Sequence, residues 1–146
     1  MDPFRLQRFV DAQNPVYARV RAELAAGEKR GHWMWFVFPQ LAMLGQSETS
    51  RRYGIVSRAE ADAYMRHPVL GSRLVECTRL VLGIRGKTVR DIFGTPDDLK
   101  FRSCMTLFHT VAPTEPAFAD ALNRLLDGKP DPRTLLWLAP GEPSKR

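Results

Sequence analysis

Apolar residues recur along most of the chain with the spacing of amphipathic α-helices. Val16, Val20 and Leu24 stand four residues apart and form one apolar stripe. Residues 68–83 repeat the pattern, and only one short run, within residues 33–38, has the length and composition of a strand. A lone strand has no partner, so we predict an all-α fold. We expect a compact single-domain bundle of about six to eight short helices around a buried Trp-rich irregular segment.

Helix starts are marked by a short polar residue followed by proline, because proline lacks the N–H that the first helical position leaves unpaired. A capping box over residues 57–60 marks one further start, and Thr88 is expected to cap a short helix that ends at Phe93. The proline-marked starts are Asp2-Pro3, Asn14-Pro15, Thr95-Pro96 and Asp131-Pro132. We expect one domain over residues 1–140 and a flexible C-terminal tail over residues 141–146.

The stretch that organises the chain covers residues 31–54 and contains two of the three tryptophans. Its run from Trp33 to Phe38 is too apolar for the surface, and we expect a buried irregular segment or a short helix that Pro39 ends. The loop after it needs partners for its buried backbone groups. Polar side chains suited to that role follow within the stretch at Gln40, Ser47 and Ser50.

The composition of the 146 residues is that of an ordinary globular protein, with 44% hydrophobic residues and a net charge of +6. A basic balance permits nucleic acid or acidic partners, but the arginines are spread along the chain without a long run. Cys77 and Cys104 lie in apolar patterns, and we expect no metal site and no cofactor. No segment resembles a signal peptide or a membrane span, so we expect a soluble cytoplasmic protein with no membrane partner.

The helix that starts after Pro96 has a broad apolar face that includes Phe101, Cys104 and Phe108, and it places two charged side chains near that face. Asp97 falls near the middle of that face and Lys100 at its edge, whereas Asp98 and Arg102 fall outside it as an i, i+4 surface pair. One interpretation is a pocket wall in which Lys100 meets an anion. The other is that both groups reach water from the first turn, where Asp97 favours the helix dipole. Both interpretations stay open.

The 31–54 stretch and this helix together contain the candidate site residues. Apolar walls with a few convergent polar groups describe a small-molecule site, and they also describe a core. The ligand-binding candidates are Trp33, Trp35, Phe38, Gln40, Ser47, Ser50, Tyr53, Arg73, Lys100 and Ser103. Asp97, Asp98 and Lys100 are the catalytic candidates, with either aspartate as general base. No catalytic dyad or triad is evident, and whether the protein is an enzyme stays open.

Five motifs resemble the domain-of-unknown-function family 1810, which is typified by a small mycobacterial α-helical protein. They lie at Trp33 to Gln40, Leu44 to Ile55, Glu60 to Tyr64, His67 to Leu74 and Asp97 to Phe108. The resemblance covers nearly the whole chain and implies a compact, mostly α-helical domain without an established activity. Members are often labelled calpastatin, but calpastatin-like inhibitors are disordered, whereas this chain has a patterned core.

The recurrent family residues coincide with the two candidate regions, and the motifs are faintly similar to α-helical domains that act on ADP-ribose derivatives. The hypothesis is a small anionic, nucleotide-like or ADP-ribose-type ligand in an aromatic cleft. Trp35, Gln40 and Tyr53 would orient it, and Lys100 or Arg73 would meet its phosphate. The alternative is a non-catalytic module that binds nucleic acid, which is not favoured, or an acidic protein. A third hypothesis makes the Trp-rich stretch an oligomer interface, and the oligomeric state stays open.

Overall fold

The computed structural model describes residues 2–139, and within that range every regular element is a helix, as the all-α prediction requires. There are ten α-helices and one 3-10 helix in this part of the chain, more than the six to eight expected, because several are only one turn long. They are α1 (Gln7–Gln13), α2 (Tyr17–Ala26), α3 (Met34–Val37), η1 (Ala42–Leu44), α4 (Glu48–Arg52), α5 (Arg58–Arg66), α6 (Leu70–Leu82), α7 (Val89–Phe93), α8 (Asp97–Val111), α9 (Pro116–Leu125) and α10 (Pro132–Leu138).

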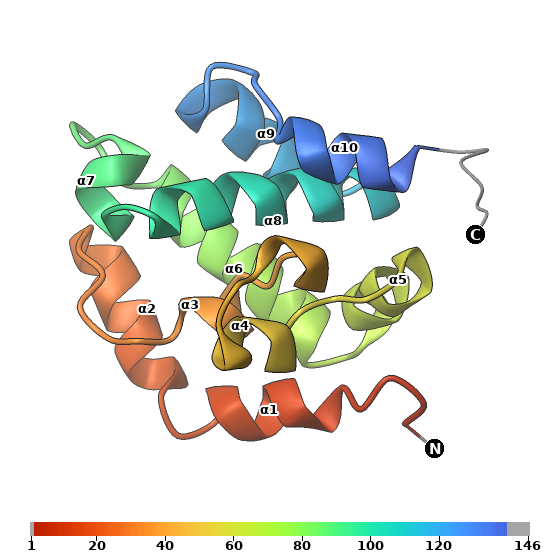
Figure 1. The fold of residues 1–146 in the computed structure, drawn as a ribbon. Helices are drawn as coiled ribbons and strands as arrows, with labels where there is room; N and C mark the ends of the chain where they lie inside the picture. The colour runs from red at the N-terminus through yellow and green to blue at the C-terminus, as the bar shows by residue number, and fades with distance from the viewer. Residues whose placement is uncertain (1, 140–146) are drawn as a thin grey trace.

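The two longest helices, α6 and α8, form the centre of the bundle. Helix α6 packs against α2, α5 and α9, while α8 packs against α5, α7, α9 and α10. Figure 1 shows α9 and α10 on one side of α8 and the short helices α3 and α4 on the other. The expected apolar face of α8 is buried, since Phe101, Cys104 and Phe108 have no exposed surface. Burial of this face positions the rest of α8 beside the α3–α4 segment.

Three of the expected helix starts have the side-chain caps that their sequences indicate. The hydroxyl of Ser57 accepts a hydrogen bond from the backbone amide of Glu60, and Thr88 caps α7 in the same way. The carboxylate of Asp131 accepts from the Thr134 amide at 2.9 Å. Such caps satisfy backbone donors that a helix leaves unpaired, and each is worth about 1 kcal/mol.

Two other expected starts differ in the structure. Asp2 caps a turn rather than a helix, because its carboxylate accepts from the Leu6 and Gln7 amides, and α1 begins only at Gln7. Thr95 does not cap α8, since its hydroxyl donates instead to the Asp98 carboxylate at 2.8 Å. In both cases the polar side chain bonds to a partner other than the expected helix amide.

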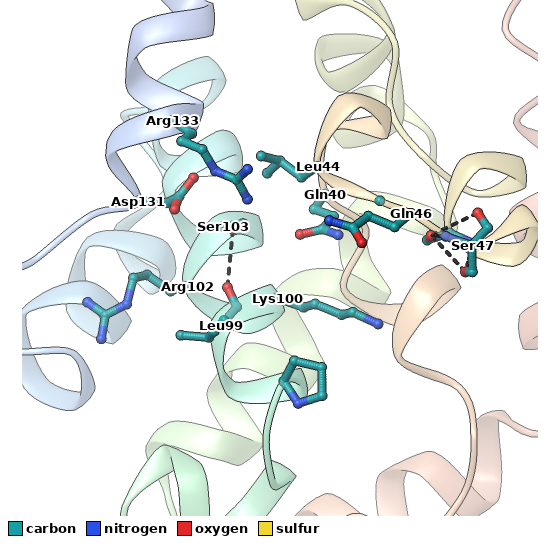
Figure 2. Close-up of a pocket in the computed structure, with 13 residues that line it drawn as sticks. Gln40, Leu44, Gln46, Ser47, Leu99, Lys100, Arg102, Ser103, Asp131 and Arg133 are labelled. Atoms are coloured by element: carbon teal, nitrogen blue, oxygen red, sulfur yellow. Dashed lines mark hydrogen bonds between the residues drawn. The ribbon is translucent and has the colours of Figure 1, made fainter.

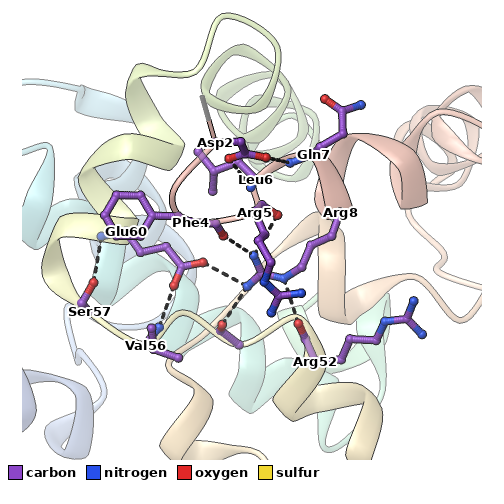
Figure 3. A network of polar contacts seen from close by, with 11 residues as sticks. Asp2, Phe4, Arg5, Leu6, Gln7, Arg8, Arg52, Val56, Ser57 and Glu60 are labelled. Atoms are coloured by element: carbon purple, nitrogen blue, oxygen red, sulfur yellow. Dashed lines mark hydrogen bonds and ion pairs between the residues drawn. The ribbon is translucent and has the colours of Figure 1, made fainter.

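A largely buried ion pair joins α1 to the first turn of α5 (Figure 3). The Arg8 guanidinium lies 3.0 Å from the Glu60 carboxylate and also donates to backbone carbonyls, including those of Arg52 and Gly54. Glu60 is 2% exposed and also accepts from the Val56 amide, so it does not complete a capping box with Ser57. The pair fixes the end of the loop that carries η1 and α4.

The expected flexible tail, residues 141–146, lies outside the described residues. Among residues 2–139 there is no helix with the length and apolar character needed to cross a membrane. The same described range has no strand, and its one β-bridge joins Leu41 to Ile55.

Candidate functional site

A cavity of about 480 Å³ lies between the η1–α4 loop and α8, with the start of α10 closing one side. Figure 2 shows Gln40 and Gln46 near each other, Lys100 and Ser103 on the α8 side, and Arg133 reaching in from α10. A volume of this size is typical of a small-molecule site. Three segments that are distant in the sequence therefore meet around one hollow.

The wall that contains Gln40 is held by the bridge between Leu41 and Ile55. The Ala42 amide donates to the Ile55 carbonyl at 2.9 Å, and the Ile55 amide donates to the Gln40 carbonyl at 2.9 Å. Gly54 allows this approach, because a Cβ there would lie 2.4 Å from the Ala42 Cα. The bridge closes the loop at its base and fixes the backbone from which the Gln40 amide projects.

Ser47 and Ser50 line the cavity but also form the capping box of α4. The Ser50 amide donates to the Ser47 hydroxyl at 3.1 Å, and the Ser47 amide donates to the Ser50 hydroxyl at 3.0 Å. Helix α4 was expected to be loop, because Gly45 and Gly54 bracket it. The two serines therefore have a structural role, and their spacing of three residues was the signal that could have predicted it.

Lys100 lines the cavity from the first turns of α8, and its ammonium group lies beside an acidic group and an aromatic ring. Its Nζ is 3.7 Å from the Asp97 carboxylate and 5.5 Å from the centre of the Trp35 ring. Asp97 makes a closer ion pair, 2.9 Å, with Lys29. At 3.7 Å the contact between Lys100 and Asp97 is too long for a hydrogen bond, so the Lys100 ammonium keeps hydrogen-bonding capacity toward the cavity.

The charge in the cavity is predominantly positive. Lys100, Arg102 and Arg133 line it, and Asp131 is the one carboxylate among its described lining residues. That carboxylate caps α10, where it accepts from both the amide and the hydroxyl of Thr134. A cleft with an excess of one sign of charge concentrates ligands of the opposite sign.

The polar groups of the cavity are only partly used by the protein. The side-chain amides of Gln40 and Gln46, and the guanidinium of Arg133, make no hydrogen bond or ion pair to any residue in the described range. In contrast, the Ser103 hydroxyl donates to the Leu99 carbonyl at 3.1 Å. The unused donors and acceptors converge on one space, which is the arrangement that a polar ligand requires.

The expected aromatic wall is not part of this cavity. Trp33 and Phe38 are 2% and 1% exposed and lie in the core. The Trp33 indole N–H donates to Glu23 at 2.8 Å, and Phe38 packs edge-on against Phe93 and Phe101. Both rings are buried and contact other residues of the protein. Of the two interpretations that the pattern left open, the core interpretation describes their positions. The apolar part of the cavity is aliphatic, with Leu44 and Leu99.

Trp35, Tyr53 and Arg73 also lie outside the lining of the cavity. Trp35 touches the site only through Lys100. Tyr53 packs against Phe9 and Phe36 on the far side of α4. The Arg73 guanidinium stacks on the Tyr17 ring and donates to the Gln13 amide oxygen at 3.2 Å, so it serves the α1–α2–α6 contact.

Neither aspartate named as a general base lines this cavity. Asp97 points to Lys29 and Lys100, and Asp98 accepts from the Thr95 hydroxyl and the Leu99 amide. The expected ion pair between Asp98 and Arg102 does not form, because the Arg102 guanidinium donates to the Leu126 and Lys129 carbonyls. The first turn of α8 thus directs both carboxylates away from the hollow.

Residues that sequence reasoning missed supply much of the lining. Leu99 and Arg102 stand three residues apart, and Ser103 is four residues after Leu99, so all three share one face of α8. That spacing could have predicted from the sequence that Leu99 and Arg102 lie on the same face as the candidate Ser103. Arg133 and Gln46 had none, because their place in the site depends on how α10 and the η1–α4 loop pack against α8.

Metal and thiol chemistry have no evident site among residues 2–139. No group of three or more His, Cys, Asp or Glu side chains in that range could hold a metal ion. Cys77 and Cys104 are buried, and burial raises the pKa of Cys77 to about 12 and that of Cys104 well above its ordinary value. Thiols with raised pKa values are poor nucleophiles, so neither cysteine is an active-site candidate.

The comparisons with known proteins agree with this fold. The family model described as "Protein of unknown function (DUF1810)" matches residues 3–138. No curated protein matches the chain. The crystal structure of the conserved hypothetical protein Rv1873 from Mycobacterium tuberculosis is 53% identical, with a TM-score of 0.92, over 94% of this chain and 98% of that one. The chain therefore belongs to the DUF1810 family of proteins of unknown function.

Proposed function

We propose that the protein binds a small anionic ligand of nucleotide-like or ADP-ribose type, and that the cavity between the η1–α4 loop and α8 receives its phosphorylated sugar. The observation that supports the proposal is the convergence of unused polar groups with an excess of positive charge. Gln40 and Gln46 contribute side-chain amides, and Lys100 and Arg133 contribute cationic groups. The four residues line the cavity of about 480 Å³.

The lining suits a sugar phosphate better than an aromatic base. Side-chain amides both donate and accept, as sugar hydroxyls do, and a lysine ammonium or an arginine fork binds phosphate. Among the described residues of the walls there is no aromatic ring on which a base could stack, and Leu44 and Leu99 provide only a small apolar area. Any base of the ligand would then extend past the rim.

The proposal concerns binding rather than a reaction. Asp131 is the one carboxylate among the described lining residues, and its Oδ2 atom is engaged by Thr134. A general base needs a free acceptor within hydrogen-bond reach of the reacting group. Asp97 and Asp98, the two carboxylates among the catalytic candidates, do not line the cavity, and Lys100, which does, has the proposed role of holding the ligand's negative charge.

A thermal-shift screen tests the proposal with ribose 5-phosphate, AMP, NAD, ADP-ribose and inorganic phosphate. A ligand at about 100 times its Kd adds roughly 2.7 kcal/mol of stability. For a domain of this size that corresponds to a rise in Tm of roughly 5–10 °C. We expect such a rise with at least one of the sugar phosphates.

Lys100→Met is the variant that connects the shift to the cavity. Loss of a charge-assisted hydrogen bond costs about 1.5–3 kcal/mol, so the affinity should fall roughly 10- to 100-fold. Lys129→Met is the matched control, because Lys129 is exposed and does not line the cavity. A shift that Lys100→Met leaves intact, or no shift with any probe, would contradict the proposal.

A further inference from the structure

A second cavity, of about 370 Å³, lies next to the first and shares one residue with it. It is formed by α7, α8 and the end of α9. Arg102 lines both cavities, and Figure 2 shows its side chain extending away from Lys100 and Gln40. The Arg102 guanidinium donates to the Leu126 and Lys129 carbonyls, so its side chain is held where the two cavities meet.

The second cavity is also predominantly positive. Four cations line it, and two carboxylates, Asp98 and Asp127, accompany them. The cations are Lys87, Arg90, Arg102 and Arg124. They come from three different helices and one loop, so their proximity is a product of the packing and not of a basic run in the sequence.

Two of these cations have no partner in the described part of the chain. Lys87 donates to the Gly27 carbonyl at 3.0 Å, and Arg102 is held as described above. Arg90 and Arg124 make no ion pair and no side-chain hydrogen bond to any residue between 2 and 139. The two carboxylates of the lining, Asp98 and Asp127, form no ion pair with either arginine, and Asp98 accepts from the Thr95 hydroxyl instead. Arginines with free guanidinium forks suit phosphate, which they can bind with two parallel hydrogen bonds.

We propose that the ligand of the first cavity has a second anionic group, a phosphate or a diphosphate, and that Arg90 and Arg124 bind this group in the second cavity. The inference rests on the proposed function, since it extends the same ligand past Arg102. It narrows the ligand class to sugars that have anionic groups at both ends. A monophosphate would occupy only the first cavity, and Arg90 and Arg124 in the second cavity would then have no ligand.

Calorimetric titration with two probes distinguishes binding in the first cavity alone from binding in both cavities. The probes are ribose 5-phosphate, with one anionic group, and 5-phosphoribosyl 1-diphosphate, which has a phosphate and a diphosphate at opposite ends of the same sugar. We expect the second probe to bind at least tenfold more tightly. Arg90→Met and Arg124→Met should remove that advantage while changing the Kd of ribose 5-phosphate less than twofold.

Two further variants make the outcomes distinguishable. Lys100→Met should weaken both probes, because it acts in the first cavity. Arg19→Met is the matched arginine control, exposed on α2 and absent from both linings, and should change neither Kd. Both tested arginines are exposed, so the variants should fold, and an unchanged circular dichroism spectrum and Tm without ligand verify it.

Four results would overturn the inference. Equal affinity for the two probes, or an advantage that survives both arginine variants, would refute the second subsite while leaving the proposed function in place. No binding of either probe would refute both. Binding of single-stranded oligonucleotides that strengthens with their length and has a steep salt dependence would instead identify the arginines as part of a nucleic-acid surface.

Discussion

Glu23 illustrates how a buried polar residue sets the position of the 31–54 stretch. Its carboxylate accepts three hydrogen bonds, from the Arg30 and Gly31 amides and from the Trp33 indole. Burial by itself would raise the pKa of Glu23, but these donors more than offset that effect and hold the pKa below its ordinary value. The folded protein therefore favours the ionised carboxylate.

Glu23→Gln should lower the free energy of unfolding by about 1–2 kcal/mol at pH 7, because the charge-assisted hydrogen bonds become neutral ones. The folded pKa lies below the unfolded one, so the stabilisation is present above the unfolded pKa and is lost as the pH falls through the folded pKa. Urea unfolding at pH 7 and at pH 3 should show the difference from wild type shrinking at the lower pH.

Glu28→Gln provides the control for this experiment. Glu28 is exposed and pairs only with Arg30 at the surface, so its removal should change the free energy of unfolding by less than about 0.5 kcal/mol at either pH. A Glu23→Gln penalty that is the same at both pH values would contradict the role of the ionised carboxylate.

Prediction at the residue scale succeeded where one element decides a side chain's position. The apolar wheel of α8 correctly identified Phe101, Cys104 and Phe108 as core. For Trp33 the pattern left a core position and a ligand site open, because an apolar run cannot assign a ring to one or the other. The position of the Trp33 ring in the core depends on its hydrogen bond to Glu23, ten residues earlier, and no pattern in the sequence links these two residues.

At the scale of elements, the crossing of α5 and α6 depends on Gly71. A Cβ at this position would lie 2.2 Å from the backbone carbonyl oxygen of Met65, at the end of α5. A backbone atom cannot move aside as a flexible side chain does. Helix α6 therefore needs glycine here, although glycine lowers helix propensity.

Gly71→Ala should lower the free energy of unfolding by about 1–3 kcal/mol or more, since the clash forces the two helices apart. Helix propensity alone predicts the opposite sign, a gain of about 1 kcal/mol. Gly83→Ala is the control, because a Cβ there would meet only ordinary contacts of 3.5 Å or more. Urea unfolding of both variants measures the two effects, and a stabilised Gly71→Ala protein would contradict the close contact.

Three helix starts whose capping partner lies within the same turn were predicted. Ser57, Thr88 and Asp131 each bond to an amide three residues later. Helix α4 was missed because the flanking glycines indicate a loop more strongly than the paired serines indicate a cap. The displaced start of α1 has a similar origin, in the bonds that Asp2 makes to Leu6 and Gln7.

At the scale of the whole molecule, the cavity is a product of tertiary packing. The sequence offered candidates from two regions, the α8 helix and the 31–54 stretch. The structure brings five of them together in the lining of one cavity: Lys100, Ser103, Gln40, Ser47 and Ser50. Arg133 joins them because α10 packs against α8. No periodicity in a single segment encodes that contact, so the positive charge of the site was visible from sequence only as scattered arginines.

Amide chemical-shift mapping is the measurement that shows whether a small anionic ligand binds in this cavity. In a two-dimensional NMR titration with ribose 5-phosphate, we expect the largest shifts within residues 44–50, residues 99–103 and residues 131–133, and their loss in Lys100→Met. Shifts concentrated elsewhere, or no shifts at millimolar ligand, would contradict the claim.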